Sequence, residues 1–193
     1  MERLFRPPTP YKHYKIDGKD FWLLDHPIYA ANFTVEQKTG AAPGTASDPQ
    51  TYMDLKANDV ASTEATSYQA PAAQLAIPTT GTTYSFEAVF RGHWTGTFTS
   101  ISNVKFWRNA GDLATGYTIY AGSNASYVQP TNEQSTVAAA LLPTSEGSAI
   151  GLDYASNYSA YLYMQARVAP TATQGDAITN QGSGAFRWQW DEA

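Results

Sequence analysis

Few residues in this chain have the type and spacing that enzymatic chemistry needs. Glycoside hydrolysis requires two carboxyl groups that face each other across a cleft. Glu87 lies among aromatic residues and is the best single candidate for one of them, with Glu133 or Asp153 as its partner. No spacing links these three residues. We therefore expect Glu87 and Arg91 to line the solvent face of a strand, and we expect no catalytic residue and no enzymatic activity.

The candidate metal ligands are equally scattered. His13, His26 and His93 show no ligand spacing, and the absence of cysteine excludes thiolate zinc sites and thiol catalysis. Asp48 and Asp112 could each supply one oxygen, whereas calcium takes about six or more. No P-loop, Gly-x-Ser-x-Gly elbow or His-Glu-x-x-His motif occurs. We expect no metal site and no cofactor.

Aromatic residues are the abundant group with binding potential, since the chain holds 13 Tyr, 8 Phe and 5 Trp. On the surface of a β-sandwich such rings can stack against sugars, and this glycan platform would comprise Trp94, Trp107, Tyr161 and Tyr163. The competing interpretation places them in the core and in subunit contacts, where aromatic side chains dominate the energetics. We prefer the second interpretation because alternating aromatic residues on strands usually face a core.

The elements that must position these residues are β-strands. Apolar and polar residues alternate with a period of two, as in a half-buried strand, most clearly at 83–91, 160–168 and 185–190. Shorter strand signals occur at 29–36, 51–56 and 116–120, and apolar residues continue at mixed spacing over 98–107. Only 135–142 allows one or two helical turns. The alternation predicts a core that includes Phe86, Phe90, Ile119, Leu162, Met164 and Trp188.

About eight short strands separated by Gly, Pro and Asn predict an all-β fold: a single antiparallel β-sandwich, jelly-roll-like or Ig-like. The sandwich domain should span 28–193, after an extended N-terminal arm at 1–27. Pro7, Pro8 and Pro10 exclude a regular helix or central strand at the start of this arm. With 42% apolar residues the chain can build a core, which excludes a disordered protein.

Charge and hydropathy limit the partners. The net charge is −5 with no basic block, so we expect no nucleic-acid partner. No run of about 18 apolar residues occurs, so we expect no membrane span, and the N-terminus lacks the apolar core of a secretory signal, so synthesis should be cytoplasmic. The arm carries five positive and four acidic residues, whereas 109–193 carries two positive and seven acidic ones, so the chain is mildly basic at one end and acidic at the other. This imbalance is either accidental or places the basic arm of one copy on the acidic body of the next.

The arm also carries too much apolar surface to leave in water. We therefore predict that it connects copies of the protein, or binds neighbouring proteins, and that the connecting residues include Leu4, Phe5, Tyr11, Tyr14, Phe21 and Trp22. The alternative is that the arm folds back on its own sandwich as an edge strand.

Three segments carry a family resemblance: Ile-Ser-Asn-Val-Lys-Phe-Trp at 101–107, Gly-Tyr-Thr-Ile-Tyr-Ala-Gly at 116–122 and Phe-Arg-Trp-Gln-Trp-Asp-Glu at 186–192. Together with the Pro-containing arm, they resemble structural proteins of tailed-phage or related virus particles. The resemblance implies a non-enzymatic capsid decoration, neck, tail or baseplate protein, located in the virion and made in the host cytoplasm. The lack of long helices counts against a major capsid or portal protein. The alternative function is a carbohydrate-binding β-sandwich module that binds a receptor or glycan.

Overall fold

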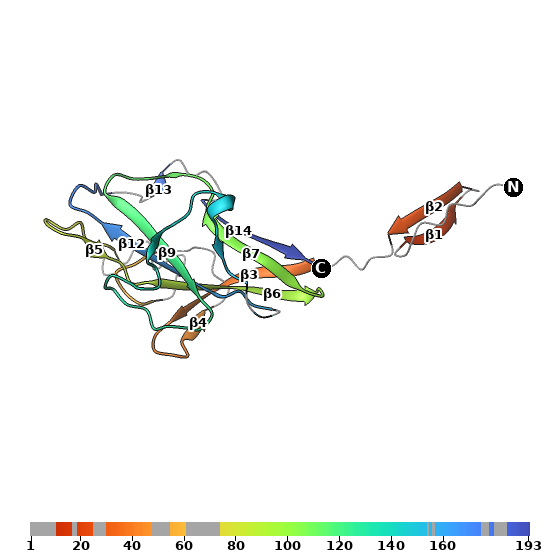
Figure 1. Cartoon of the computed structure of the whole chain (residues 1–193), viewed down its shortest axis with the longest axis horizontal. Coiled ribbons are helices and arrows are strands. Elements are labelled where there is room, and N and C mark those ends of the chain that lie inside the picture. The colour runs from red at the N-terminus through yellow and green to blue at the C-terminus, as the bar shows by residue number, and fades with distance from the viewer. Residues whose placement is uncertain are drawn as a thin grey trace.

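The computed structural model describes residues 11–16, 19–24, 30–47, 55–60, 74–153, 155, 157–174, 178–179 and 185–193 (Figure 1). Its regular elements are β-strands, apart from one 3-10 turn, η2, at Glu146–Ser148. All strand pairs are antiparallel, which confirms the predicted all-β class. The strands are β1 Tyr11–Ile16, β2 Lys19–Leu24, β3 Ala30–Thr39, β4 Thr45–Ser47, β5 Thr83–Tyr84, β6 Ala88–Thr97, β7 Ile101–Arg108, β8 Asp112–Leu113, β9 Tyr117–Asn124, β10 Ala140–Leu141, β11 Ile150–Gly151, β12 Tyr161–Val168, β13 Ile178–Thr179 and β14 Phe186–Glu192.

The larger layer is a seven-stranded sheet in the order β10-β9-β12-β6-β3-β4, with β5 paired to the end of β12. β12 is its central strand, because it pairs with β9 along its whole length and with β6 and β5 on its other side. The smaller layer has the order β11-β7-β14, and β13 and β8 form a separate pair.

The core of the sandwich lies between the two layers. The larger sheet contributes Phe90 and Trp94 from β6 and Leu162 and Met164 from β12, all fully buried, and β7 contributes Phe106 from the facing layer. At roughly 25 cal/mol per Å² of apolar area removed from water, these large side chains provide most of the stabilisation of the fold. The antiparallel β-sandwich predicted from the alternating pattern is therefore present.

The outer face of the larger sheet is covered as well. A second buried cluster, formed by Val89, Ala138, Tyr161 and Tyr163, lies on this face, beneath a segment without regular structure at 125–139, which we call the strap. Because both faces of the sheet are covered, nearly every residue of β12 is buried.

The core prediction is confirmed for Phe90, Ile119, Leu162 and Met164, which are buried, whereas Phe86 and Trp188 are only half-buried. The predicted solvent face of 83–91 is wrong: Ser85 is 0% exposed and Glu87 is 3% exposed. The strand is interrupted at 85–87, and Ser85 and Glu87 hydrogen-bond to β12 and the strap instead of water.

The helical turns considered at 135–142 do not form. Ser135 Oγ and the Ala138 N–H donate hydrogen bonds to the Glu87 carboxylate. Ala140–Leu141 forms strand β10, which pairs with β9. The 51–56 strand signal falls mostly outside the described residues.

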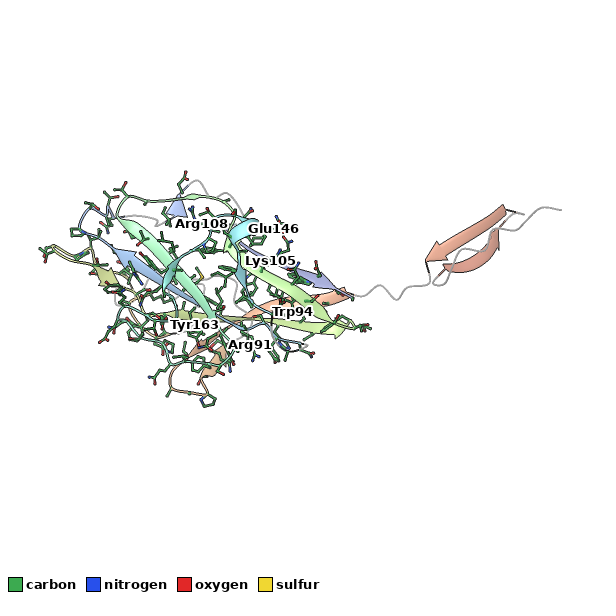
Figure 2. The ribbon with its side chains drawn as sticks, in the orientation of Figure 1. Arg91, Trp94, Lys105, Arg108, Glu146 and Tyr163 are labelled. Carbon is green, nitrogen blue, oxygen red and sulfur yellow. The ribbon has the colours of Figure 1, made fainter. Side chains whose placement is uncertain are left out.

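The outside of the smaller layer carries η2. Glu146 of this turn forms an exposed ion pair with Lys105 of β7, at 3.6 Å between Nζ and Oε1, and Gln189 of β14 donates a hydrogen bond to the same carboxylate (Figure 2). Exposed pairs of this kind contribute about 0–1 kcal/mol, so they orient η2 more than they stabilise the fold.

Part of the predicted extended arm is a β-hairpin. β1 and β2 pair antiparallel from Tyr11↔Leu24 to Ile16↔Lys19 and form a two-stranded sheet of their own. Only Asp17-Gly18 separates the strands in the sequence, and this dipeptide is typical of two-residue hairpin turns.

Candidate functional site

The most distinctive surface is an open strand edge. β14 pairs on one side with β7 and is the last strand of its sheet. On the facing layer, β3 is bordered by β4 only from Gln37 to Thr39, so its first part, 31–36, also lacks an outer neighbour within the described part of the chain. The two edges lie together, because the Ala31 N–H donates to Glu192 Oε1 at 3.0 Å.

An aromatic cluster fills the space between these two strands. The Phe33 ring lies 4.7 Å from Trp190, 5.5 Å from Trp188 and 5.1 Å from Trp94, measured between ring centroids. Residues 188 and 190 project to one side of β14 because side chains alternate along a strand. Gly92 of β6 permits this packing, since a Cβ there would lie 2.9 Å from the Phe33 ring. Phe33, Trp188 and Trp190 remain half-buried, so the cluster is partly open at the edge.

The C-terminal end of β14 is acidic. Asp191 and Glu192 are exposed, and Asn103 Nδ2 donates to Asp191 Oδ2 at 3.1 Å. We call β14, the first part of β3 and their aromatic cluster the open edge. Among the described residues, this surface combines strand edges without an outer strand neighbour, aromatic rings and negative charge, which suit a polypeptide partner rather than a chemical reaction.

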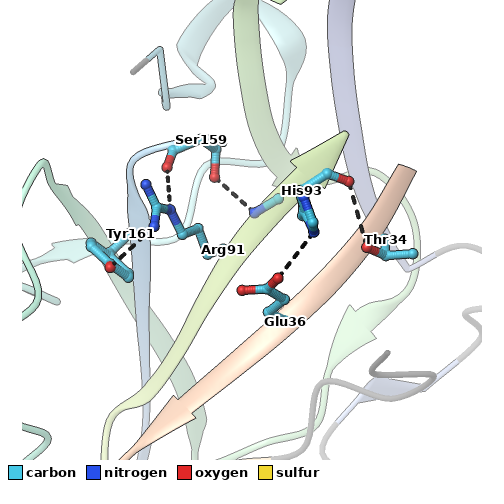
Figure 3. Close-up of polar contacts among 7 residues, drawn as sticks. Thr34, Glu36, Arg91, His93, Ser159 and Tyr161 are labelled. Atoms are coloured by element: carbon cyan, nitrogen blue, oxygen red, sulfur yellow. Dashed lines mark hydrogen bonds and ion pairs between the residues drawn. The ribbon is translucent and has the colours of Figure 1, made fainter. Parts of the chain in front are cut away.

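A cluster of polar and aromatic side chains lies on the outer face of the larger sheet (Figure 3). His93 Nδ1 lies 3.1 Å from Glu36 Oε1, and the His93 ring stacks on Tyr158 at 4.2 Å with 11° between the planes. The Arg91 guanidinium lies 4.1 Å from the Tyr158 centroid and 4.7 Å from that of Tyr161.

Arg91 is fixed further by hydrogen bonds. Its Nε donates to the Ser159 carbonyl at 3.0 Å and its Nη1 donates to the Tyr161 hydroxyl at 3.3 Å (Figure 3). The Ser159 hydroxyl accepts a hydrogen bond from the Gly92 N–H at 2.8 Å. These groups satisfy one another, so the cluster ties β3 and β6 to the segment before β12. It contains no nucleophile with an adjacent free base.

Glu87 is an anchor for the strap. Its carboxylate accepts hydrogen bonds from Ser135 Oγ and from the Ala138 N–H, and its own N–H donates to the Thr131 carbonyl. Burial raises the pKa of this carboxyl, an effect that the hydrogen bonds partly offset. Neither proposed carboxyl partner is brought to it: Glu133 is exposed on the strap, and Asp153 accepts the Val104 N–H beside β7.

The strap has further anchors. Tyr163 Oη accepts the Val128 N–H at 2.6 Å, Gln165 Nε2 donates to the Glu133 carbonyl at 2.7 Å, and Tyr127 Oη donates to the Gly40 carbonyl at 2.7 Å. Burial raises the pKa of Tyr163 to about 12, so the hydroxyl stays protonated at neutral pH.

The predicted glycan platform does not form an exposed surface. Its four members, Trp94, Trp107, Tyr161 and Tyr163, are each at most 8% exposed. Trp94 packs in the core between the layers, whereas Tyr161 and Tyr163 lie on the opposite face of the sheet with the strap. All four rings are thus buried, Trp94 and the two tyrosines lie on opposite faces of the larger sheet, and Trp107 lies on β7 of the smaller layer.

The residues predicted to form the assembly arm are partly described. Tyr11 and Tyr14 lie on β1, Phe21 and Trp22 lie on β2, and Tyr14 is opposite Phe21 in the register. Leu4 and Phe5 lie outside the described residues.

The metal candidates remain separate. Among the described residues, no group of three or more His, Asp or Glu could hold a metal ion. His13 is opposite Trp22 in the hairpin, His93 is paired with Glu36, and Asp112 lies on β8. His26 and Asp48 lie outside the described residues.

Comparison with known proteins identifies no relative. No protein-family description matches the sequence, and neither a curated protein nor a solved structure matches it significantly. In the described part of the chain, no helix has the length and apolar character needed to cross a membrane.

Proposed function

We propose that this protein is a non-enzymatic structural component of a virus particle, of the capsid decoration, neck, tail or baseplate kind, that acts through subunit–subunit contacts. The observation that carries the assembly role is the hairpin: its described strand pairs are all internal. An isolated two-stranded hairpin is marginally stable in water. A partner surface that covers it would supply the missing stabilisation.

The composition of the hairpin supports the same role. Its strands carry more aromatic and aliphatic residues than a hairpin exposed to water on both faces would need. These residues include Tyr11, Tyr14, Phe21, Trp22, Leu23 and Leu24. Ordering such a segment costs about 1–2 kcal/mol of backbone entropy per residue. A single contact should therefore be weak, and a repeated array, as in a particle, should be strong. The virus-particle assignment itself rests on the resemblance of 101–107, 116–122 and 186–192.

The test compares the full chain with a chain that begins at Pro27. We expect the full chain to self-associate in sedimentation velocity and to bind particles. We expect the shortened chain to be monomeric, to keep the circular dichroism spectrum of a folded β-protein and to melt cooperatively. A full-length variant with Phe21→Ser and Trp22→Ser should behave like the shortened chain. A matched variant with exposed Ile77→Ser and Val128→Ser should associate normally.

Two outcomes would contradict the proposal. If the shortened chain unfolds, the hairpin belongs to the core of its own domain. If the full chain stays monomeric at high concentration and does not bind particles, the hairpin does not connect subunits.

A further inference from the structure

We propose that the hairpin of one copy docks on the open edge of a second copy, where one of its strands pairs with β14 and extends the three-stranded sheet. This inference deepens the proposed assembly function and rests on it. The occupant is residues 11–24 of another copy, and the acceptor is β14 with the aromatic cluster beneath it.

The backbone of β14 is the first argument. An edge strand presents a row of unpaired N–H and C=O groups that can template another strand. The other terminal strands of the two main sheets are short, with three residues in β4 and two each in β10 and β11. β14 has seven residues, and each hairpin strand has six. The donor and acceptor therefore match in length, and β14 is the longest terminal strand of the two main sheets.

The apolar surface at this edge is the second argument. Phe33, Trp188 and Trp190 contact one another between β3 and β14 but keep part of their surface in water. A strand added to β14 would cover this remaining surface. Removal of apolar surface from water favours such a contact.

Charge complementarity is the third argument. The hairpin strands contain Lys12, Lys15 and Lys19 against a single acidic residue, Asp20. The acceptor strand ends in exposed Asp191 and Glu192. Opposite charges at the ends of the contact fix its register and favour encounter.

The position of the acceptor explains how copies would be linked. Glu192 of β14 bonds to Ala31 near the start of β3, and five residues, 25–29, separate β2 from β3. The hairpin is thus separated by only five residues from the strand that contacts the acceptor. The hairpin makes no described strand pair with its own β14, so we assign the docked hairpin to a second copy. Such an exchange closes as a symmetric dimer or continues as an array.

Cysteine cross-linking tests the contact directly, because the natural chain has no cysteine. One population carries Arg187→Cys on β14, at an exposed position. The other carries Lys12→Cys, Lys15→Cys or Lys19→Cys in the hairpin. After mixing and mild oxidation, we expect a covalent dimer of the two populations for at least one hairpin position. The matched control, Ala140→Cys on the exposed short edge strand β10, should give several-fold less product.

Charge reversal provides a second readout that leaves the aromatic cluster unchanged, although it removes the acceptors of the Asn103 and Ala31 hydrogen bonds. Asp191→Lys with Glu192→Lys should weaken association several-fold, and Lys12→Glu with Lys15→Glu in the other copy should restore it. Circular dichroism spectra and melting temperatures check that each variant is folded.

The outcomes separate this inference from the proposed function. If the full chain associates, but no hairpin cysteine reaches Arg187→Cys and charge reversal has no effect, the assembly function stands and the β14 site is wrong. A third sample carries Arg187→Cys and one hairpin cysteine in the same chain. If this chain forms an internal disulfide while the two mixed populations give no covalent dimer, the hairpin docks on its own body and the inference falls. If the full chain never associates, the proposed function fails first.

Discussion

Glu87 is a buried carboxyl whose contribution to stability depends on pH. Its pKa in the folded state is raised above the ordinary value by burial, so the folded protein prefers the protonated form. The stabilisation from this preference is complete below the unfolded pKa and is lost as the pH rises through the folded pKa. At neutral pH, the buried charge therefore costs free energy that an uncharged isostere avoids.

We predict that Glu87→Gln leaves the melting temperature at about pH 7 unchanged or higher, because the amide oxygen can still accept from Ser135 and Ala138. The stability of the variant should also fall less between about pH 4 and about pH 7 than that of the parent. Thermal melts across this range measure both effects, with the exposed Glu133→Gln as control. A large loss of stability at neutral pH in Glu87→Gln would show that the charge itself holds the strap.

The core makes a second prediction at this scale. Phe90 is fully buried and packs between the layers, so Phe90→Ala should reduce the free energy of unfolding by about 3–5 kcal/mol through lost burial and a cavity. Phe86→Ala should cost less, because its side chain is half-buried. Urea denaturation gives the values, with exposed Ile77→Ala as control. Equal losses for Phe86 and Phe90 would contradict the observed difference in burial.

At the scale of elements, the sequence predicts strands wherever alternation is regular. The signals at 160–168 and 185–190 correspond to β12 and β14, because side chains alternate between the two faces of a strand. The same rule misplaces Ser85 and Glu87, which it assigns to solvent. They are buried under a strap that has no periodic pattern of its own, so alternation contains no information about it.

The candidate site was likewise predictable from the sequence only in part. The arm residues could be selected from the sequence by their apolar and basic character, and Asp17-Gly18 was the available signal for the hairpin. The open edge could not be predicted, because the order of strands in a sheet depends on contacts between distant residues. Nothing local to Phe33, for example, indicates that it meets Trp190 from the other end of the chain.

The strap provides a prediction for an element. Gly122 of β9 lies directly beneath the Val137 carbonyl, and a Cβ there would collide with that oxygen. Gly122→Ala should therefore displace the strap and destabilise the protein by about 1–3 kcal/mol. Hydrogen exchange should show faster exchange of the Val128 and Ala138 amides, which bond to Tyr163 and Glu87.

Gly151→Ala is the matched control, since no atom lies within 4 Å of a Cβ at that position. If the Gly122→Ala variant has the same amide exchange rates and melting temperature as this control, the strap does not pack on β9 as described.

At the scale of the whole molecule, the sandwich and the hairpin have different sources of stability. The sandwich covers both faces of its central strand, and Arg91, Glu87 and Gln165 form hydrogen bonds within it. The hairpin has described strand pairs only with itself. A molecule built this way combines a self-sufficient body with a segment that gains stability from a partner, and its stability should depend on how much partner is present.

This dependence is the last prediction: the melting temperature of the full chain should rise with protein concentration. A partner that binds the folded state at about 100 times its Kd adds about 2.7 kcal/mol, and a chain of this size gains about 2–4 °C per kcal/mol. The expected increase is therefore about 5–10 °C between a dilute sample and one at about 100 times the Kd. The increase should shrink in high salt, because the Lys residues of the hairpin and the acidic end of β14 are screened.

Differential scanning calorimetry at several protein concentrations measures this increase in melting temperature. The chain that begins at Pro27 is the matched control, and its melting temperature should stay constant. If both chains melt independently of concentration, the hairpin does not gain its stability from a second copy; if both rise equally, the association involves the body alone.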